Sequence, residues 1–191
     1  SSIIGNDTLS DEIVRQKAIW ERFPENKVYL ANYIQHLIGD SRRDYVVSEI
    51  TKARNLEPEN AAYDYLLCGI LLREALEVSP AWSKTDPPER FYILRDRQKL
   101  DRAMAELKKG MEKPCYHLYI QDMFRERMRI LNFPQDYTGQ LQKFLFSSRI
   151  KLSALRIQRD IFRAIPFYAH LLQDEGKQRE AEFYRDAWKH L

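Results

Sequence analysis

Apolar residues recur at helical spacing along much of the chain. Two stripes are clearest, Leu30-Tyr33-Ile34-Leu37-Ile38 and Val46-Val47-Ile50-Ala53-Leu56. Spacings of three and four residues place each stripe on one side of a helix. Gly39-Asp40 separates the two stripes and Pro58 follows the second one. Two helices joined by so few residues pack antiparallel, so the pattern predicts a helical hairpin over residues 24–57.

A short motif returns 34 residues further along the chain. Pro24-Glu25-Asn26 reappears as Pro58-Glu59-Asn60, and Tyr29 and Leu37 align with Tyr63 and Leu71. A helix–turn–helix unit of this period resembles the tetratricopeptide repeat (TPR). The glycine usual on the first helix of that family is replaced here by Ile34 and Cys68. The resemblance implies an all-α fold, in which antiparallel helix hairpins form a right-handed, TPR-like superhelix.

The second repeat, over residues 58–113, is interrupted by an inserted segment at 78–99. Its prolines and polar residues are typical of a loop, and Trp82 lies among them. We expect Trp82 to fold back and plug one end of the groove of the stack. The alternative is that the loop forms one wall of a partner site. A helical stripe follows, consisting of Ile93, Leu100, Met104, Leu107 and Met111.

Two further hairpins are expected, over residues 114–165 and 166–191. The first contains a candidate helix that starts at Pro114 and a long amphipathic helix over 140–165. The stripe of the long helix is Ile150, Ala154, Ile157, Ile161 and Ile165. Pro166 is expected to kink or restart it. The whole chain, 1–191, is therefore interpreted as a single helical domain.

Composition agrees with a packed helical protein and adds one asymmetry. Hydrophobic residues make up 44% of the chain and there are only six glycines, which argues against a β fold with many turns. Residues 1–89 carry a net charge of −5 and residues 90–191 a net charge of +8. Such a basic half attracts nucleic acid, anionic lipid or an acidic peptide, unless it is simply a solvated helical surface. Its clearest feature is a basic stripe of Arg149, Arg156, Arg159 and Arg163.

No familiar catalytic or metal-binding motif is present. The phosphate loop, the dinucleotide-binding glycines, HExxH and GxSxG are all missing, and the four histidines lie far apart. Cys68 and Cys115 belong to no CxxC pair, so we expect two free, largely buried thiols. The sequence therefore predicts no enzyme, no cofactor and no metal.

The sequence says little about location. It has no apolar run long enough to span a bilayer, and residues 1–7 do not resemble a signal peptide. A cytoplasmic location is slightly favoured. A trimmed N-terminus would leave a membrane-anchored or exported protein as the alternative.

The TPR resemblance implies a protein–protein interaction scaffold that binds a peptide or a partner helix on its concave face. The family geometry assigns to that face Asn32, Gln35, Tyr65, Gly69, Arg73, Gln121, Arg125 and Arg129. For half of them the alternative is an ordinary surface position. The Asn/Lys clamp for chaperone tails is not reproduced, so a chaperone-tail receptor is not expected. The alternative function is binding of nucleic acid or an anionic membrane surface through the basic C-terminal half.

Overall fold

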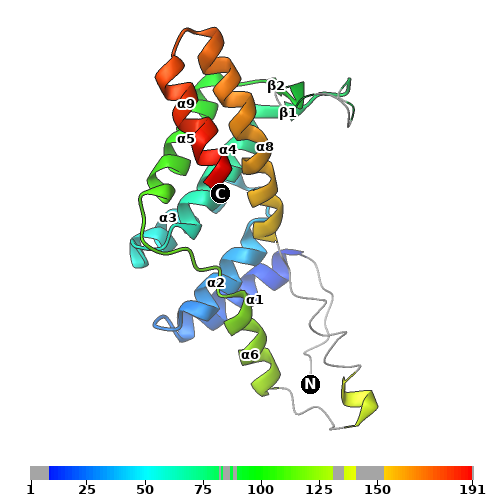
Figure 1. The fold of residues 1–191 in the computed structure, drawn as a ribbon. Coiled ribbons are helices and arrows are strands. Elements are labelled where there is room, and N and C mark those ends of the chain that lie inside the picture. Colours follow the sequence, from blue (N-terminus) through cyan, green and yellow to red (C-terminus); the bar gives the residue numbers. More distant parts are fainter. Residues whose placement is uncertain are drawn as a thin grey trace. The chain divides into compact units, whose positions relative to one another are not determined.

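The computed structural model describes residues 9–81, 83, 87, 90–130, 136–140 and 153–190. These residues are mostly helical, with one small two-stranded sheet, which confirms the all-α prediction (Figure 1). The chain divides into two compact units. Unit 1 contains the residues up to Glu49 together with His117–Ala154, and unit 2 contains Ile50–Tyr116 and Leu155–Leu191.

Unit 1 contains helices α1 (Leu9–Arg22), α2 (Lys27–Leu37) and α6 (Ile120–Ile130), and the first half of α3 (Arg43–Leu56). The stripe predicted for residues 30–38 is buried throughout. The ring of Tyr33 is fully buried and stacks on Trp20 with 5.7 Å between the ring centroids. The core of unit 1 is therefore built on the apolar face of α2.

The repeated Pro-Glu-Asn motif marks the start of a helix in both copies. The Asn26 side chain accepts hydrogen bonds from the backbone N–H groups of Val28 and Tyr29, at 3.0 and 3.3 Å. In the second copy, Asn60 Oδ1 accepts from the N–H of Ala62 at 3.1 Å. Asparagine is a preferred residue at this place because its oxygen satisfies N–H groups that have no partner within the helix.

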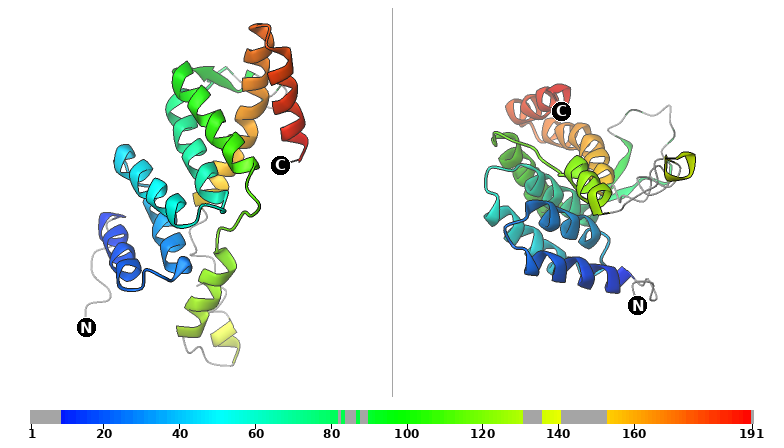
Figure 2. Two further views of the ribbon diagram at one scale, coloured as in Figure 1. Left: turned by 90° about the vertical axis from the view of Figure 1, so that its left-hand side faces the viewer. Right: turned by 90° about the horizontal axis from the view of Figure 1, so that it is seen from below.

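Unit 2 contains two antiparallel helix pairs. The first pair is α4 (Ala62–Ala75) with α5 (Arg97–Met111), and the second is α8 (Ser153–Asp174), from Leu155 onward, with α9 (Gln178–His190). The two pairs lie side by side in both views of Figure 2. Their shared core contains fully buried side chains from α4, α5 and α8, namely Ile70, Leu100, Met104, Leu107, Ile157, Ile165 and Leu172.

A β-hairpin that the sequence pattern did not reveal begins just before the inserted segment and ends within it. Strands β1 (Leu76–Val78) and β2 (Tyr92–Leu94) pair antiparallel, with Leu76 opposite Leu94. Ile93, predicted to begin the stripe of the following helix, lies in β2 and is exposed instead. The ring of Tyr92 contacts Phe167 of α8, so the hairpin packs on that helix. Trp82 lies outside the described residues, and its role stays a prediction.

Two predicted helix boundaries are wrong. The helix expected from Pro114 begins only at Ile120, which leaves Tyr116 outside it. Pro166 does not start a new helix, because α8 runs across it as one helix. A proline removes the hydrogen bond to the carbonyl four residues earlier, here that of Phe162. That carbonyl accepts a hydrogen bond from the indole N–H of Trp188 at 3.0 Å.

Candidate binding site

Helix α8 lies against the face of α4 that carries Gly69. A Cβ atom added to Gly69 would lie only 2.2 Å from Cγ2 of Ile157, which shows how closely the two helices approach. One turn further along α4, Arg73 forms an ion pair of 3.1 Å with Asp160 of α8. The Gly69 face of α4 is therefore covered by the chain itself.

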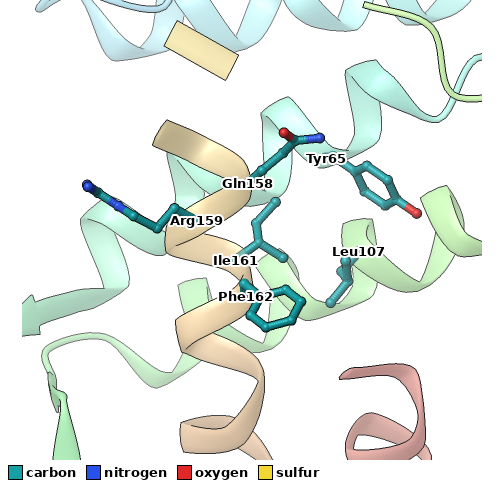
Figure 3. Close-up of a pocket in the computed structure, with 6 residues that line it drawn as sticks. All are labelled: Tyr65, Leu107, Gln158, Arg159, Ile161 and Phe162. Carbon is teal, nitrogen blue, oxygen red and sulfur yellow. The ribbon is translucent and has the colours of Figure 1, made fainter. Parts of the chain in front are cut away.

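A pocket opens beside this contact, between α4, α5 and α8. Its volume is about 280 Å³. Figure 3 shows Gln158 and Tyr65 at one end and Phe162 with Leu107 at the other, while the Arg159 head group extends away from them. The residues that line it are Tyr65, Leu107, Gln158, Arg159, Ile161 and Phe162.

Tyr65 is held in place from two sides. A Cβ atom at Gly110 would lie 2.5 Å from Cε1 of Tyr65, so α5 closes the back of the ring. On the other side, the ring centroid of Tyr116 lies 5.4 Å from that of Tyr65. The Gln158 amide donates a hydrogen bond to the Tyr116 hydroxyl. Burial raises the pKa of both phenols, so each of them stays protonated at neutral pH.

The lining of the pocket combines apolar and uncharged polar side chains with one arginine. Among the described residues that line it there is no carboxylate, imidazole or thiol. Leu107, Ile161 and Phe162 provide apolar walls, and the amide of Gln158 supplies donor and acceptor groups. Phe162 is 42% exposed at its edge. Such a site can hold an apolar side chain, while the amide forms a hydrogen bond to a polar group next to it, such as a peptide unit.

Two clusters of buried polar side chains elsewhere contain ion pairs and hydrogen bonds among their own members. In unit 1 the Tyr33 hydroxyl donates to buried Glu49 at 2.8 Å, and Lys17 lies 3.2 Å from the same carboxylate. In unit 2 the buried carboxylate of Asp64 lies 2.5 Å from Lys113 Nζ. A buried charge is tolerated when it is paired in this way. Both clusters join neighbouring helices, and we assign them a structural role.

The predicted partner-binding residues fall in both units. In unit 1, Gln35 is buried, and its side-chain oxygen accepts from the backbone N–H of Ala154 at 3.2 Å. Asn32 is half-buried and donates to Gln16. The three residues on α6 are exposed, and two of them pair within that helix, Arg125 with Asp122 and Arg129 with Glu126; the third is Gln121.

In unit 2 the three predicted residues have three different environments. Tyr65 lines the pocket, Arg73 is paired with Asp160, and Gly69 is buried under Ile157. Gly69 and Gln35 therefore do not line an open groove in this structure. The family geometry assigned both of them to the concave face, but it carries no information about another segment that covers that face.

The basic stripe is only partly described. Arg149 lies outside the described residues, whereas Arg156, Arg159 and Arg163 are exposed on α8. Arg159 lies 3.6 Å from Asp160, and the Arg163 guanidinium lies 4.7 Å from the centroid of the Phe91 ring. Two of these three arginines thus have partners within unit 2.

Sequence reasoning missed the pocket residues Leu107, Gln158, Ile161 and Phe162 as binding residues. Leu107 and Ile161 were interpreted as core, which their burial confirms. The available signal was Phe162, a large aromatic residue next to the apolar stripe of α8 rather than on it. An exposed aromatic beside a buried stripe is a useful pointer to a binding edge.

The thiol and imidazole groups form no metal centre in the described parts of the chain. Cys68 is buried, and burial raises the pKa of its thiol. Cys115 is exposed, contrary to prediction, and its Sγ lies 3.0 Å from the carbonyl oxygen of Glu59. His36 is buried, and His170 is exposed. Of the helices described, none has the length and apolarity needed to cross a membrane.

Comparison with known proteins adds no relative. No protein family, no curated protein and no solved structure matches this chain. The candidate site is therefore defined by its own geometry.

Proposed function

We propose that this chain is a protein-interaction module that holds an apolar side chain of a peptide partner in the pocket between α4, α5 and α8. The observation that carries the proposal is the pocket itself, with the exposed edge of Phe162 and the fixed amide of Gln158. The paired helices of unit 2 and the Pro-Glu-Asn helix starts support a divergent TPR-like arrangement behind it.

The size of the pocket favours a side chain over a cofactor. Small-molecule sites usually enclose roughly 300–1,000 Å³, and this pocket of about 280 Å³ lies just below that range. An apolar anchor placed in such a pocket can dominate the binding energy of a larger, otherwise weak interface. The residues around the pocket then contribute shape complementarity and little binding free energy.

The test is selection of binding peptides from a displayed random library, followed by affinity measurements on single variants. We expect selected peptides to share a large aliphatic or aromatic residue. Phe162→Ser should weaken their binding by about tenfold or more, the effect of losing one well-packed contact. The matched control is Leu155→Ser, which removes another exposed apolar side chain of α8 that does not line the pocket.

Selected peptides that bind Phe162→Ser as tightly as the parent protein would show that the pocket is not the site. A library that yields no binder at all would argue against the function itself. Circular dichroism of both variants checks that the helices remain intact.

A further inference from the structure

A second pocket of unit 2 has a different chemistry. It lies along α8 and α9, which run antiparallel beside each other (Figure 1), and its volume is about 530 Å³. This value falls within the usual range for small-molecule sites. The described residues that line it are Pro87, Arg90, Pro166, His170, Gln173, Arg185, Trp188 and Lys189.

Cationic groups enter this pocket from more than one segment. Arg185 and Lys189 lie one turn apart on α9, and Arg90 comes from the segment that precedes β2. The described lining includes no carboxylate. Three cationic groups around one cavity create a positive potential that an anion can neutralise.

The carboxylates that pair with Lys189 and His170 do not line the pocket, and both are exposed to solvent. Lys189 lies 2.9 Å from Asp186, whose side chain is 68% exposed, and His170 lies 3.6 Å from Asp174, which is 63% exposed. Exposed ion pairs of this kind contribute little free energy, so a ligand competes with them readily. Arg185 donates to the neutral amide of Gln173, so its charge is not compensated by that contact.

The pocket also has an apolar surface. Trp188 is 37% exposed, and its indole N–H is held by the Phe162 carbonyl at 3.0 Å, which fixes the plane of the ring. Pro166 contributes a second rigid apolar group from α8. A fixed aromatic plane next to cationic groups suits a ligand that combines an anionic group with an apolar or ring-shaped part.

We propose that this pocket binds a soluble organic anion whose phosphate or carboxylate group is held by Arg185, Lys189 and Arg90, while its apolar part lies on Trp188. The two pockets share no lining residue, although the ring of Phe162 in the first contacts that of Trp188 in the second, with 5.4 Å between the centroids. The proposal does not rest on the peptide site, because its ligand and its test are different.

The test is isothermal titration calorimetry with phenyl phosphate, inorganic phosphate and benzyl alcohol. Phenyl phosphate should bind most tightly, because it alone offers both the anion and the ring. Arg185→Gln should weaken its binding by about tenfold or more, as expected for loss of a charge-assisted hydrogen bond. The control Arg179→Gln removes an exposed arginine of the same helix that does not line the pocket, and it should change the affinity less than twofold.

Several results would overturn the proposal. These are no heat of binding for phenyl phosphate, equal losses in the two arginine variants, or equal affinities for phenyl phosphate and benzyl alcohol. Binding to vesicles that contain phosphatidylserine, without binding of phenyl phosphate, would assign the cationic groups to a membrane surface instead. If Arg185→Gln fails to fold by circular dichroism, Lys189→Met replaces it with the same expected loss.

Discussion

The contact between Gly69 and Ile157 predicts that the cost of adding a methyl group at position 69 depends on the side chain at position 157. An alanine is better than a glycine inside a helix by about 1 kcal/mol, so Gly69→Ala would ordinarily stabilise α4. Here the new methyl group meets Cγ2 of Ile157 at 2.2 Å, and Ile157 is fully buried. Overpacking of this kind costs about 1–3 kcal/mol. A clash this short belongs to the upper part of that range, so we expect a net loss of about 1–2 kcal/mol.

The decisive measurement is the same substitution in an Ile157→Ala background. Ile157→Ala alone should cost about 2–5 kcal/mol, because it opens a cavity in the core of unit 2. Cγ2 is then gone, but Cβ of residue 157 would still lie 3.1 Å from the new methyl group. Gly69→Ala should therefore lose its large cost in this background and change the stability by less than about 1 kcal/mol. Thermal unfolding followed by circular dichroism resolves these effects, since 1 kcal/mol shifts Tm by roughly 2–4 °C in a chain of this size.

The control background is Leu155→Ala, which truncates an exposed residue of the same helix. Gly69→Ala should remain destabilising there, because Ile157 is still present. A Gly69→Ala variant that is stabilised in all three backgrounds would refute the close approach of α4 and α8. The covered face of α4 would then be open to a partner, as the TPR resemblance implies.

Two further effects can be measured in the same way. Leu37→Ala should cost about 2–5 kcal/mol because its side chain is fully buried, whereas Leu71→Ala should cost less because Leu71 is only half-buried; equal losses in thermal unfolding would contradict this. Hydrogen bonds from Arg42 lower the pKa of buried Asp40, so this pair stabilises the fold above the unfolded pKa of about 3.9 and loses that effect as the pH falls through the folded value. Arg42→Gln should therefore lower Tm at pH 7 and progressively less below about pH 4, and a pH-independent difference would rule this out.

Local signals in the sequence were sufficient for most of the helices. The apolar stripes of α2 and α5 depend on spacing alone, Asn26 caps α2, and Asn60 accepts a hydrogen bond from the first residue of α4. The β-hairpin was not predictable in this way. Its strands are three residues long and are separated by residues 79–91, so pairing depends on contacts that spacing does not encode.

The candidate sites needed information from distant segments. The first pocket joins Tyr65 to Phe162, and the second joins Arg90 to Arg185. The sequence pattern correctly separated the polar and apolar faces along much of each helix. Whether a residue on a face is buried, however, depends on the segment that packs against that face. Gly69 illustrates this, since its accessibility is decided by a side chain 88 positions later in the chain.

A residue distant in the sequence also helps α8 to continue across Pro166, and this role can be tested directly. Without an N–H at position 166, the Phe162 carbonyl relies on the indole of Trp188. Trp188→Phe should cost about 0.5–1.5 kcal/mol for this hydrogen bond, in addition to the loss of ring contacts. In a Pro166→Ala background the backbone N–H at position 166 satisfies the same carbonyl, so the hydrogen-bond part of that cost should disappear. Thermal unfolding of the parent protein, the two single variants and the double variant gives the coupling free energy between positions 166 and 188. As a control, Phe183→Leu, at another exposed aromatic of α9, should show a coupling near zero with Pro166→Ala. Equal costs of Trp188→Phe in both backgrounds would mean that the indole does not compensate for the proline.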